Sequence, residues 1–341
     1  MMKKIELVKL TLVAIALTIA GCSNSTPTAE VESYGRETTV TQTELETTTT
    51  PEGVEVVAVN PELTLTPAGD WQENNHVHAL AVNPVEAEIV YVATHRGLVK
   101  RSPEGEWLLV GSDRSDYMGF ATHPTEIYRL YSSGHPRDGG NLGFRITDNQ
   151  GEDWQVISMP GVDFHALAVA PSNPDLIYGW ATSGKKGFFV SADGGKTWDE
   201  VRPEGLGGSP FNFVVDPENS DRLFAITRNG LFESSDRGKN WQLIPNTDYV
   251  PVIGFALVRE GSQTAMYAYR VLSSGGGIYK SVDGGTNWEA VSKEVEGTIL
   301  YLAVAPNNAD MMYAVNEENT IFQSSDRGKT WKPLTINSIP N

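Results

Sequence analysis

The sequence predicts an all-β fold, a six-bladed β-propeller of four-stranded antiparallel sheets, with seven blades as the alternative. Two observations predict it. Four near-identical octapeptides end at tryptophans that lie 43 to 47 residues apart, which is the length of one four-stranded blade. Each repeat also contains an apolar segment, and most of these segments end in proline. The octapeptides are SADGGKTW, SSDRGKNW, SVDGGTNW and SSDRGKTW, which end at Trp198, Trp241, Trp288 and Trp331.

Two further copies of the octapeptide bring the expected number of blades to six. TDNQGEDW, ending at Trp154, keeps the spacing but has Asn149 where the other copies have aspartate. A shortened copy, SPEGEW, ends at Trp107. Because the blades of a propeller close into one ring, we expect a single folded domain over residues 54–341 despite its length.

The octapeptide has the composition of a hairpin turn. Its aspartate can accept hydrogen bonds from backbone N–H groups ahead of it, and a glycine such as Gly195 tolerates a positive φ. The tryptophan opens the next strand and buries its ring between sheets. Because one aspartate per blade spreads around a ring and cannot converge on a substrate, we expect these residues to be structural. They are Asp193, Asp236, Asp283 and Asp326.

The apolar segments predict the innermost strand of each blade. A short run with period-2 patterning follows each of them and predicts the second strand. A third strand then enters the octapeptide, and the fourth begins at its tryptophan. The inner segments are HALAVNP, ending at Pro84, MGFATHP at Pro124, HALAVAP at Pro171, FNFVVDP at Pro217, IGFALV from Ile253, and LYLAVAP at Pro306.

The N-terminus has the pattern of a bacterial lipoprotein signal peptide. A positively charged start precedes an apolar run from Leu10 to Ala20, and a lipobox-like Ile-Ala-Gly-Cys sequence ends at Cys22. Cys22 is the only cysteine, so we expect it to carry lipid rather than to form a disulfide. Residues 1–21 are then a signal peptide. The mature protein is expected to be an exported lipoprotein, anchored to the outer face of the cell membrane or to the outer membrane.

A tether is expected between the lipid anchor and the propeller. Residues 22–53 are rich in Thr, Ser and Glu and contain few apolar residues, a composition typical of disordered segments. Residues 54–66 are a candidate for an extra strand that helps to close the ring.

The charge of the chain excludes one class of partner. The formal net charge is −17, from 43 acidic and 26 basic residues, and no cluster of lysine and arginine could track a phosphate backbone. We therefore expect no binding to nucleic acid.

The histidines are the second signal in the sequence, because all six lie between His76 and His165, in the first three blades. Aligned on the prolines, one inner-strand position holds His78, Met118 and His165. Two residues earlier, on the same face of the strand, stand His76, Asp116 and Asp163. His95 and His135 each follow the tyrosine of their second strand by four residues. Because the first strand of a blade begins and the second ends at the same rim, we expect all these side chains at one mouth of the axial channel.

Imidazoles with carboxylates and a thioether are typical ligands of a transition metal. Histidine with methionine favours copper, and histidine with aspartate favours zinc or iron. A polar ligand or glycan site built from the same residues is the alternative, and so are hydrogen bonds between blades. His123, in a Thr-His-Pro turn on the opposite rim, is expected to be structural.

The octapeptides resemble the Asp boxes, or BNR repeats, of the sialidase-like superfamily, which also includes sortilin-type receptors, xyloglucanases and a photosystem II assembly factor. The resemblance covers the chain from about His76 to the C-terminus. It is greatest to exported bacterial BNR-repeat lipoproteins that are often labelled glycosyl hydrolases. It implies the fold, whereas function has to be argued from the site.

The resemblance to sialidases does not extend to their catalytic motifs. Those enzymes combine an arginine triad, a Tyr-Glu nucleophile and an FRIP motif on an early strand. Here Arg145 lies in an FRIT sequence on an expected third strand, and the remaining candidates are Arg96, Arg228 and Arg270. An inverting pair of carboxylates would have to be Asp116 and Asp163.

Three functions therefore remain open from the sequence. The first is a propeller that binds a ligand, such as a transition metal, at the His-rich rim. The second is a glycoside hydrolase acting on extracellular glycans. The third is a non-catalytic assembly factor or a scaffold for a protein partner.

Overall fold

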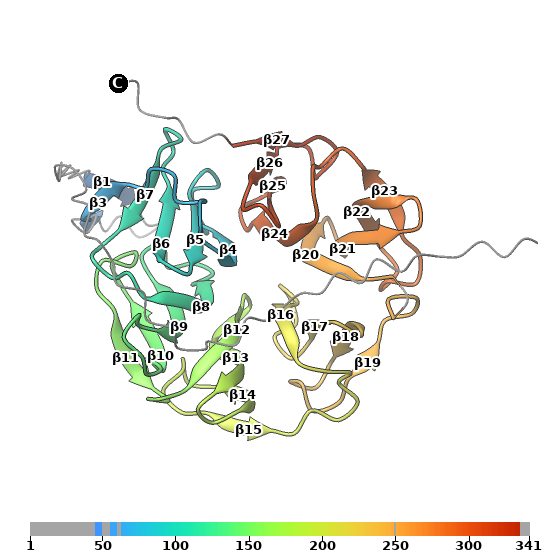
Figure 1. Cartoon of the computed structure of the whole chain (residues 1–341), viewed down its shortest axis with the longest axis horizontal. Coiled ribbons are helices and arrows are strands. Elements are labelled where there is room, and N and C mark those ends of the chain that lie inside the picture. Colours follow the sequence, from blue (N-terminus) through green and yellow to red (C-terminus); the bar gives the residue numbers. More distant parts are fainter. Residues whose placement is uncertain (1–44, 50–54, 60–62, 249, 335–341) are drawn as a thin grey trace, which may run out of the picture. The chain divides into compact units, whose positions relative to one another are not determined.

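The structure is a computed structural model that describes residues 45–49, 55–59, 63–248 and 250–334. All elements in these ranges are strands. Six antiparallel sheets, five of four strands and one of five, surround a common axis, as Figure 1 shows. The predicted six-bladed β-propeller is confirmed. Within the described ranges, no helix is long and apolar enough to cross a membrane.

In every blade four consecutive strands run in chain order from the innermost outwards. Blade 1 contains β4 (Val77–Val82), β5 (Val90–Thr94), β6 (Gly97–Arg101) and β7 (Trp107–Val110). Blade 2 contains β8 (Asp116–Thr122), β9 (Leu130–His135), β10 (Phe144–Thr147) and β11 (Gln155–Ser158). Blade 3 contains β12 (Asp163–Ala170), β13 (Asn173–Ser183), β14 (Gly187–Ser191) and β15 (Asp199–Val201).

The second half of the ring repeats this order. Blade 4 contains β16 (Pro210–Val215), β17 (Leu223–Thr227), β18 (Gly230–Ser234) and β19 (Gln242–Leu243). Blade 5 contains β20 (Val252–Glu260), β21 (Gln263–Leu272), β22 (Gly275–Ser281) and β23 (Glu289–Ser292). Blade 6 contains β24 (Ile299–Ala305), β25 (Asn308–Asn316), β26 (Ile321–Ser324) and β27 (Lys332–Pro333).

Three short strands precede the first blade. β1 (Leu45–Thr49) and β2 (Glu55–Val59) pair with each other as a hairpin. β3 (Leu65–Pro67) pairs with β7 and gives blade 1 a fifth, outermost strand. An extra strand is thus present near residues 54–66, but it lies at the outer edge of blade 1 and does not close the ring as expected, because it pairs only within its own blade. The expected signal peptide (1–21) and most of the expected tether (22–53) lie outside the described residues.

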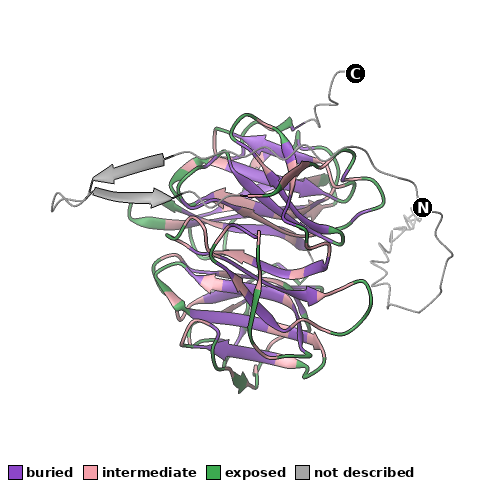
Figure 2. Cartoon of the chain, turned by 90° about the vertical axis from the view of Figure 1, so that its left-hand side faces the viewer, coloured by how far each residue is buried: buried purple, intermediate pink, exposed green. Residues whose placement is uncertain are grey.

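The hydrophobic core lies between the blades. Six clusters of buried apolar side chains each draw residues from two adjacent blades, and Figure 2 shows the buried residues following the strands. The octapeptide tryptophans fill these interfaces as predicted: the ring centroid of Trp198 lies 5.2 Å from that of Phe144 in the preceding blade. Trp241 likewise packs 6.2 Å from Phe188.

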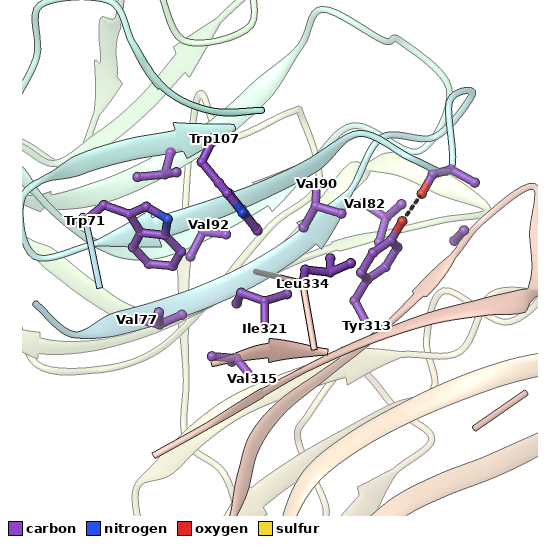
Figure 3. Close-up of a cluster of buried hydrophobic side chains, with 13 residues drawn as sticks. Trp71, Val77, Val82, Val90, Val92, Trp107, Tyr313, Val315, Ile321 and Leu334 are labelled. Carbon is purple, nitrogen blue, oxygen red and sulfur yellow. Dashed lines mark hydrogen bonds between the residues drawn. The ribbon is translucent and has the colours of Figure 1, made fainter. Parts of the chain in front are cut away.

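The ring closes through side chains. Every described sheet is built from neighbouring segments of the chain, so the first and last blades exchange no strand within the described residues. Trp71, Val92 and Trp107 pack instead against Val315 and Ile321 of blade 6 (Figure 3). The hydroxyl of Tyr313 donates a 2.8 Å hydrogen bond to the carbonyl of Ala87 across the same interface.

The octapeptides form the predicted turns. Within each turn the serine hydroxyl and the aspartate carboxylate bond different groups, which the sequence does not reveal. In blade 3 the buried Ser191 hydroxyl accepts from the backbone N–H of Gly195 at 2.8 Å and donates to Asp193. Asp193 is more exposed and accepts from the backbone and hydroxyl of Thr197 at 2.9 and 2.6 Å. The carboxylates of Asp236, Asp283 and Asp326 accept equivalent bonds from residue i+4 of their own turns.

Candidate functional site

Each innermost strand carries a β-bulge near its start. The pairing with the second strand skips one or two residues at this point, as between Val77 and Ala79 in β4. A bulge changes the direction of a side chain and leaves its residue out of the ladder. The skipped residues are His78, Met118 with Gly119, His165, Phe211, Ile253 with Gly254, and Leu300. The register predicted for His78, Met118 and His165 is therefore a structural feature repeated in all six blades.

The remaining three bulge residues complete the ring of positions at the channel mouth. Phe211 and Leu300 stand six residues before Pro217 and Pro306, as His78 stands six before Pro84. The alignment of inner segments therefore contained the signal for them. They were not expected as site residues, because their side chains cannot ligate a metal.

Strand pairing places the second-strand histidines beside the start of the first strand. The backbone N–H of His95 donates a 3.0 Å hydrogen bond to the carbonyl of His76, and Asp116 pairs directly with His135 across β8 and β9. His76 and His95 of blade 1 therefore lie side by side, and so do Asp116 and His135 of blade 2.

Asp116 is the centre of the cluster. Its carboxylate is buried, with 6% of the side chain exposed, and Oδ1 lies 3.1 Å from Nε2 of His78. Oδ2 lies 2.5 Å from Nδ1 of His95 and 3.4 Å from Nε2 of His135. Three imidazoles from blades 1 and 2 thus surround one carboxylate. Register identifies which residues share a rim, but the reach of each side chain decides which atoms meet.

Of the other predicted residues, His76 adjoins this centre, whereas His165 and Asp163 form a pair of their own on β12. The ring of His76 stands edge-on to that of His95, with centroids 6.3 Å apart. His165 pairs with Asp163 of its own strand, Nε2 to Oδ2 at 3.0 Å, and Asp163 is buried. Met118 lies half-buried in the bulge of β8, two residues beyond Asp116.

Several buried polar atoms of the cluster have no hydrogen-bond partner among the described residues. They include Nε2 of His78 and Oδ1 of Asp116, which approach each other to 3.1 Å, and Oδ1 of Asp163. Leaving such atoms unsatisfied costs free energy, so they mark a place where a ligand or cation would be stabilised. One donor atom each from His78, His95 and Asp116 lie within 4.8 Å of one another.

The electrostatics keep Asp116 ionised. Burial raises the pKa of Asp116, whereas His78, His95 and His135 lower it, and the net direction is below the usual value. An ionised carboxylate among imidazoles suits a divalent transition metal. It does not suit a glycosidic general acid, whose pKa has to be raised.

Two arginines considered for a sialidase-type triad are occupied elsewhere. Arg145 lies on the third strand β10, as predicted, where it donates to Asp113 at 2.6 Å and covers the rings of Tyr117 and Trp154. The guanidinium carbon of Arg270 lies 4.9 Å from the ring of Trp288. Both side chains are buried, so neither is free to bind a substrate carboxylate.

The remaining histidine is structural. Nδ1 of His123 accepts from the backbone N–H groups of Thr125 and Glu126 at 3.2 and 2.9 Å, which fixes the turn. Its ring stacks on Tyr131 and borders a cavity of about 680 Å³ that is also lined by the octapeptide residue Asp193. This cavity is therefore at the octapeptide rim, opposite the histidine cluster.

Two family models match the chain. The model described as photosynthesis system II assembly factor YCF48 matches residues 146–307, and the one described as sortilin, neurotensin receptor 3, matches residues 276–341. Both matches lie in the octapeptide-bearing part of the ring and begin after most of the histidine cluster.

The curated relatives are of two kinds. A probable oligoxyloglucan-reducing end-specific xyloglucanase of Neosartorya fischeri is 30% identical over 210 residues, which are 55% of this chain and 25% of that enzyme. The photosystem II assembly lipoprotein Ycf48 of Picosynechococcus is 30% identical over 167 residues, which are 48% of this chain and 47% of that protein. The chain thus spans about a quarter of the first relative and about half of the second.

Solved structures agree on the fold. The GH74 enzyme of Niastella koreensis superimposes with a TM-score of 0.55 at 17% identity, covering 75% of this chain and 45% of the enzyme. The GH74 xyloglucanase of Xanthomonas campestris gives a TM-score of 0.53 at 17% identity, covering 81% and 47%. The chain is a six-bladed β-propeller with repeated Asp-box, or BNR-type, turns, and it is similar over about half of its length to glycoside hydrolase and Ycf48 proteins.

Proposed function

We propose that this chain is an exported, lipid-anchored propeller that binds a transition metal at the histidine-rich rim of blades 1 and 2. One observation carries the proposal: three imidazoles converge on a single buried carboxylate, and atoms of two of these groups have no hydrogen-bond partner among the described residues. A cation would satisfy both atoms at once.

The donor set favours zinc or copper. Imidazole nitrogen suits both metals, and a carboxylate oxygen completes a set that zinc often uses. His78, His95 and Asp116 would hold the ion, with His135 as a further donor. The side chain of His95 is 48% exposed, so solvent or a small ligand can reach the cluster. Bound there, the metal would offer a Lewis-acidic position to such a ligand.

Metal analysis tests the proposal directly. The full-length chain, purified in detergent, is stripped with a chelator and reloaded with Zn²⁺ or Cu²⁺, and retained metal is measured by elemental analysis. We expect one ion per chain for the parent and almost none for a His78→Ala/His95→Ala variant. Arg228→Ala is the matched control, because Arg228 follows β17 as His95 follows β5. Equal retention by parent and double variant would reject the site.

Lipid attachment at Cys22 is the second part of the proposal. The lipobox-like sequence supports it, and so does the name of the relative from Picosynechococcus, a lipoprotein. Two acyl chains anchor a protein stably, whereas one alone does not. We expect Cys22→Ser to release the protein from the membrane fraction or to leave it unprocessed. A variant that is processed and retained like the parent would contradict the anchor.

An assembly or interaction role is a second candidate function. It is favoured by the match to the family model of a photosystem II assembly factor over residues 146–307. A scaffold of this kind would capture a specific protein by cross-linking in intact cells, and the His78→Ala/His95→Ala variant would capture it equally well. Loss of capture in that variant would instead make the rim part of the interaction.

Hydrolysis of glycans is less well supported. The xyloglucanase relatives favour it, but the lowered pKa of Asp116 does not suit the general acid of an inverting pair, so Asp163 would have to be the acid and Asp116 the base. Incubation with xyloglucan oligosaccharides tests it. Product formation that is lost in Asp163→Asn but survives chelation would replace the metal proposal with a glycosidase.

A further inference from the structure

The bulge ring at the channel mouth has two chemically different halves. Over blades 1 to 3 its positions hold His78, Met118 and His165, and over blades 4 to 6 they hold Phe211, Ile253 and Leu300. Phe211 is 43% exposed, and Ile253 and Leu300 are half-buried. The same β-bulge therefore carries side chains of metal-ligating types on one half of the ring and apolar side chains on the other half.

The two halves are continuous around the axis. The inner strands β12 and β16 are in contact, and so are β24 and β4, as Figure 1 shows. The apolar half therefore begins beside His165 at one end and beside His78 at the other. A molecule that coordinates a metal at His78 and Asp116 has Leu300 on the neighbouring strand.

The channel below the ring is also largely apolar. A cavity of about 440 Å³ on the axis is lined by inner-strand residues of all six blades, among them Ala79, Phe120, Leu167, Val214 and Leu302. Ala79 directly follows the bulge residue His78. Apolar side chains therefore line the channel from just below the mouth.

We propose that the mouth is one composite site for a small organic ligand that carries a metal-coordinating nitrogen or oxygen donor next to an aromatic or aliphatic group. The inference rests on the proposed metal site. The donor group completes the coordination of the metal held by His78, His95 and Asp116. The apolar group covers Leu300, on the strand beside His78, and extends towards the apolar half of the ring that ends at Phe211, which strengthens binding in proportion to the area buried.

Two probes that share a donor test this proposal. The full-length chain is loaded with Co²⁺, whose visible absorption reports a change of ligands, and is titrated with imidazole and with 4-phenylimidazole. We expect 4-phenylimidazole to bind at least about tenfold more tightly, because its ring adds buried apolar area to the same coordinating nitrogen. The Phe211→Ser/Leu300→Ser variant should bind Co²⁺ and imidazole like the parent and lose the preference for 4-phenylimidazole.

A matched control excludes general hydrophobic binding. Val282 is 56% exposed and lies in the octapeptide turn of blade 5, at the opposite rim, so Val282→Ser should keep the preference. Equal affinities for the two probes in the parent, or a preference that survives in Phe211→Ser/Leu300→Ser, would overturn the composite site while leaving the metal site standing. Failure of the parent to bind Co²⁺, Zn²⁺ or Cu²⁺ would overturn the proposed function and this inference with it.

Discussion

At the scale of single residues, the Asp-box turn depends on a buried hydroxyl as much as on its aspartate. Ser191, Ser234, Ser281 and Ser324 are almost completely buried, and each accepts from the N–H of a glycine four residues on. The aspartates stand nearer to the solvent. Removing the hydroxyl leaves a buried donor without a partner, whereas removing the carboxylate leaves groups that water can reach.

We predict that Ser324→Ala lowers the free energy of unfolding by about 2 kcal/mol, because the buried N–H of Gly328 loses its 2.8 Å hydrogen bond and is left unsatisfied. Denaturant unfolding followed by tryptophan fluorescence measures the change. Ser325→Ala is the control, since Ser325 is exposed in the same turn. If both variants lose equal stability, the buried hydroxyl has no special role.

The turn aspartates also make stability depend on pH. Hydrogen bonds from Thr197 lower the pKa of Asp193 from 3.8 to about 2, and bonds from Thr330 do the same for Asp326. A lowered carboxylate pKa favours the folded state above the unfolded value, and this contribution is lost as the pH falls towards the folded value. Stability should therefore decline between pH 3.8 and about 2.

We predict that Asp193→Asn/Asp326→Asn makes this acid-induced decline shallower. The substitution keeps the turn, because Asn149 of blade 2 already accepts from the N–H of Asp153 at 3.0 Å in the same way. Free energies of unfolding measured across the acid range give the slope for parent and variant. Parallel curves would show that other groups carry the acid dependence.

At the scale of elements, the β-bulge near the start of each inner strand directs side chains towards the channel mouth. It recurs in all six blades, so the backbone of the rim is prepared independently of the side chains placed on it. In blade 2 the bulge also needs Gly134, whose φ is +150°. A Cβ at this position would collide with the backbone oxygen of Asp116.

We predict that Gly134→Ala weakens metal binding at least about tenfold, because the collision displaces the strand that carries Asp116 from the productive geometry. Competition with a chromogenic chelator measures the affinity. Gly139→Ala is the matched control: Gly139 also has a positive φ, +93°, but a Cβ there meets no atom within 4 Å. If both variants lose the same metal affinity relative to the parent, backbone strain and not the contact with Asp116 is responsible for the loss.

At the scale of the whole molecule, the sequence was sufficient for the architecture and insufficient for the centre of the site. The octapeptide spacing predicts six blades because each turn and its tryptophan are local in sequence. The proline alignment predicts that His78 and His165 share a register, because bulges repeat with the blades. That Asp116 collects His78, His95 and His135 depends on the reach of side chains between two blades, for which the sequence carries no periodic signal.

Closure of the ring is the other property of the whole molecule. The hydrogen bond from Tyr313 to Ala87 joins residues 226 apart in sequence. The similar bond from Tyr178 to Ser220, between blades 3 and 4, joins residues 42 apart. Contacts between distant residues require more loop closure before they form. The interface between blades 6 and 1 should therefore assemble after the interfaces between consecutive blades.

We predict that Tyr313→Phe speeds unfolding roughly 30-fold and leaves refolding unchanged. The substitution removes the partner of both the Ala87 carbonyl and the side-chain amide of Gln323, a loss of about 2 kcal/mol. A contact absent from the folding transition state expresses its loss in the unfolding rate. Tyr178→Phe is the matched control and should divide its smaller effect between slower refolding and faster unfolding. Stopped-flow denaturant jumps measure both rates. If the fall in the refolding rate of Tyr313→Phe accounts for its whole loss of stability, ring closure belongs to the folding nucleus.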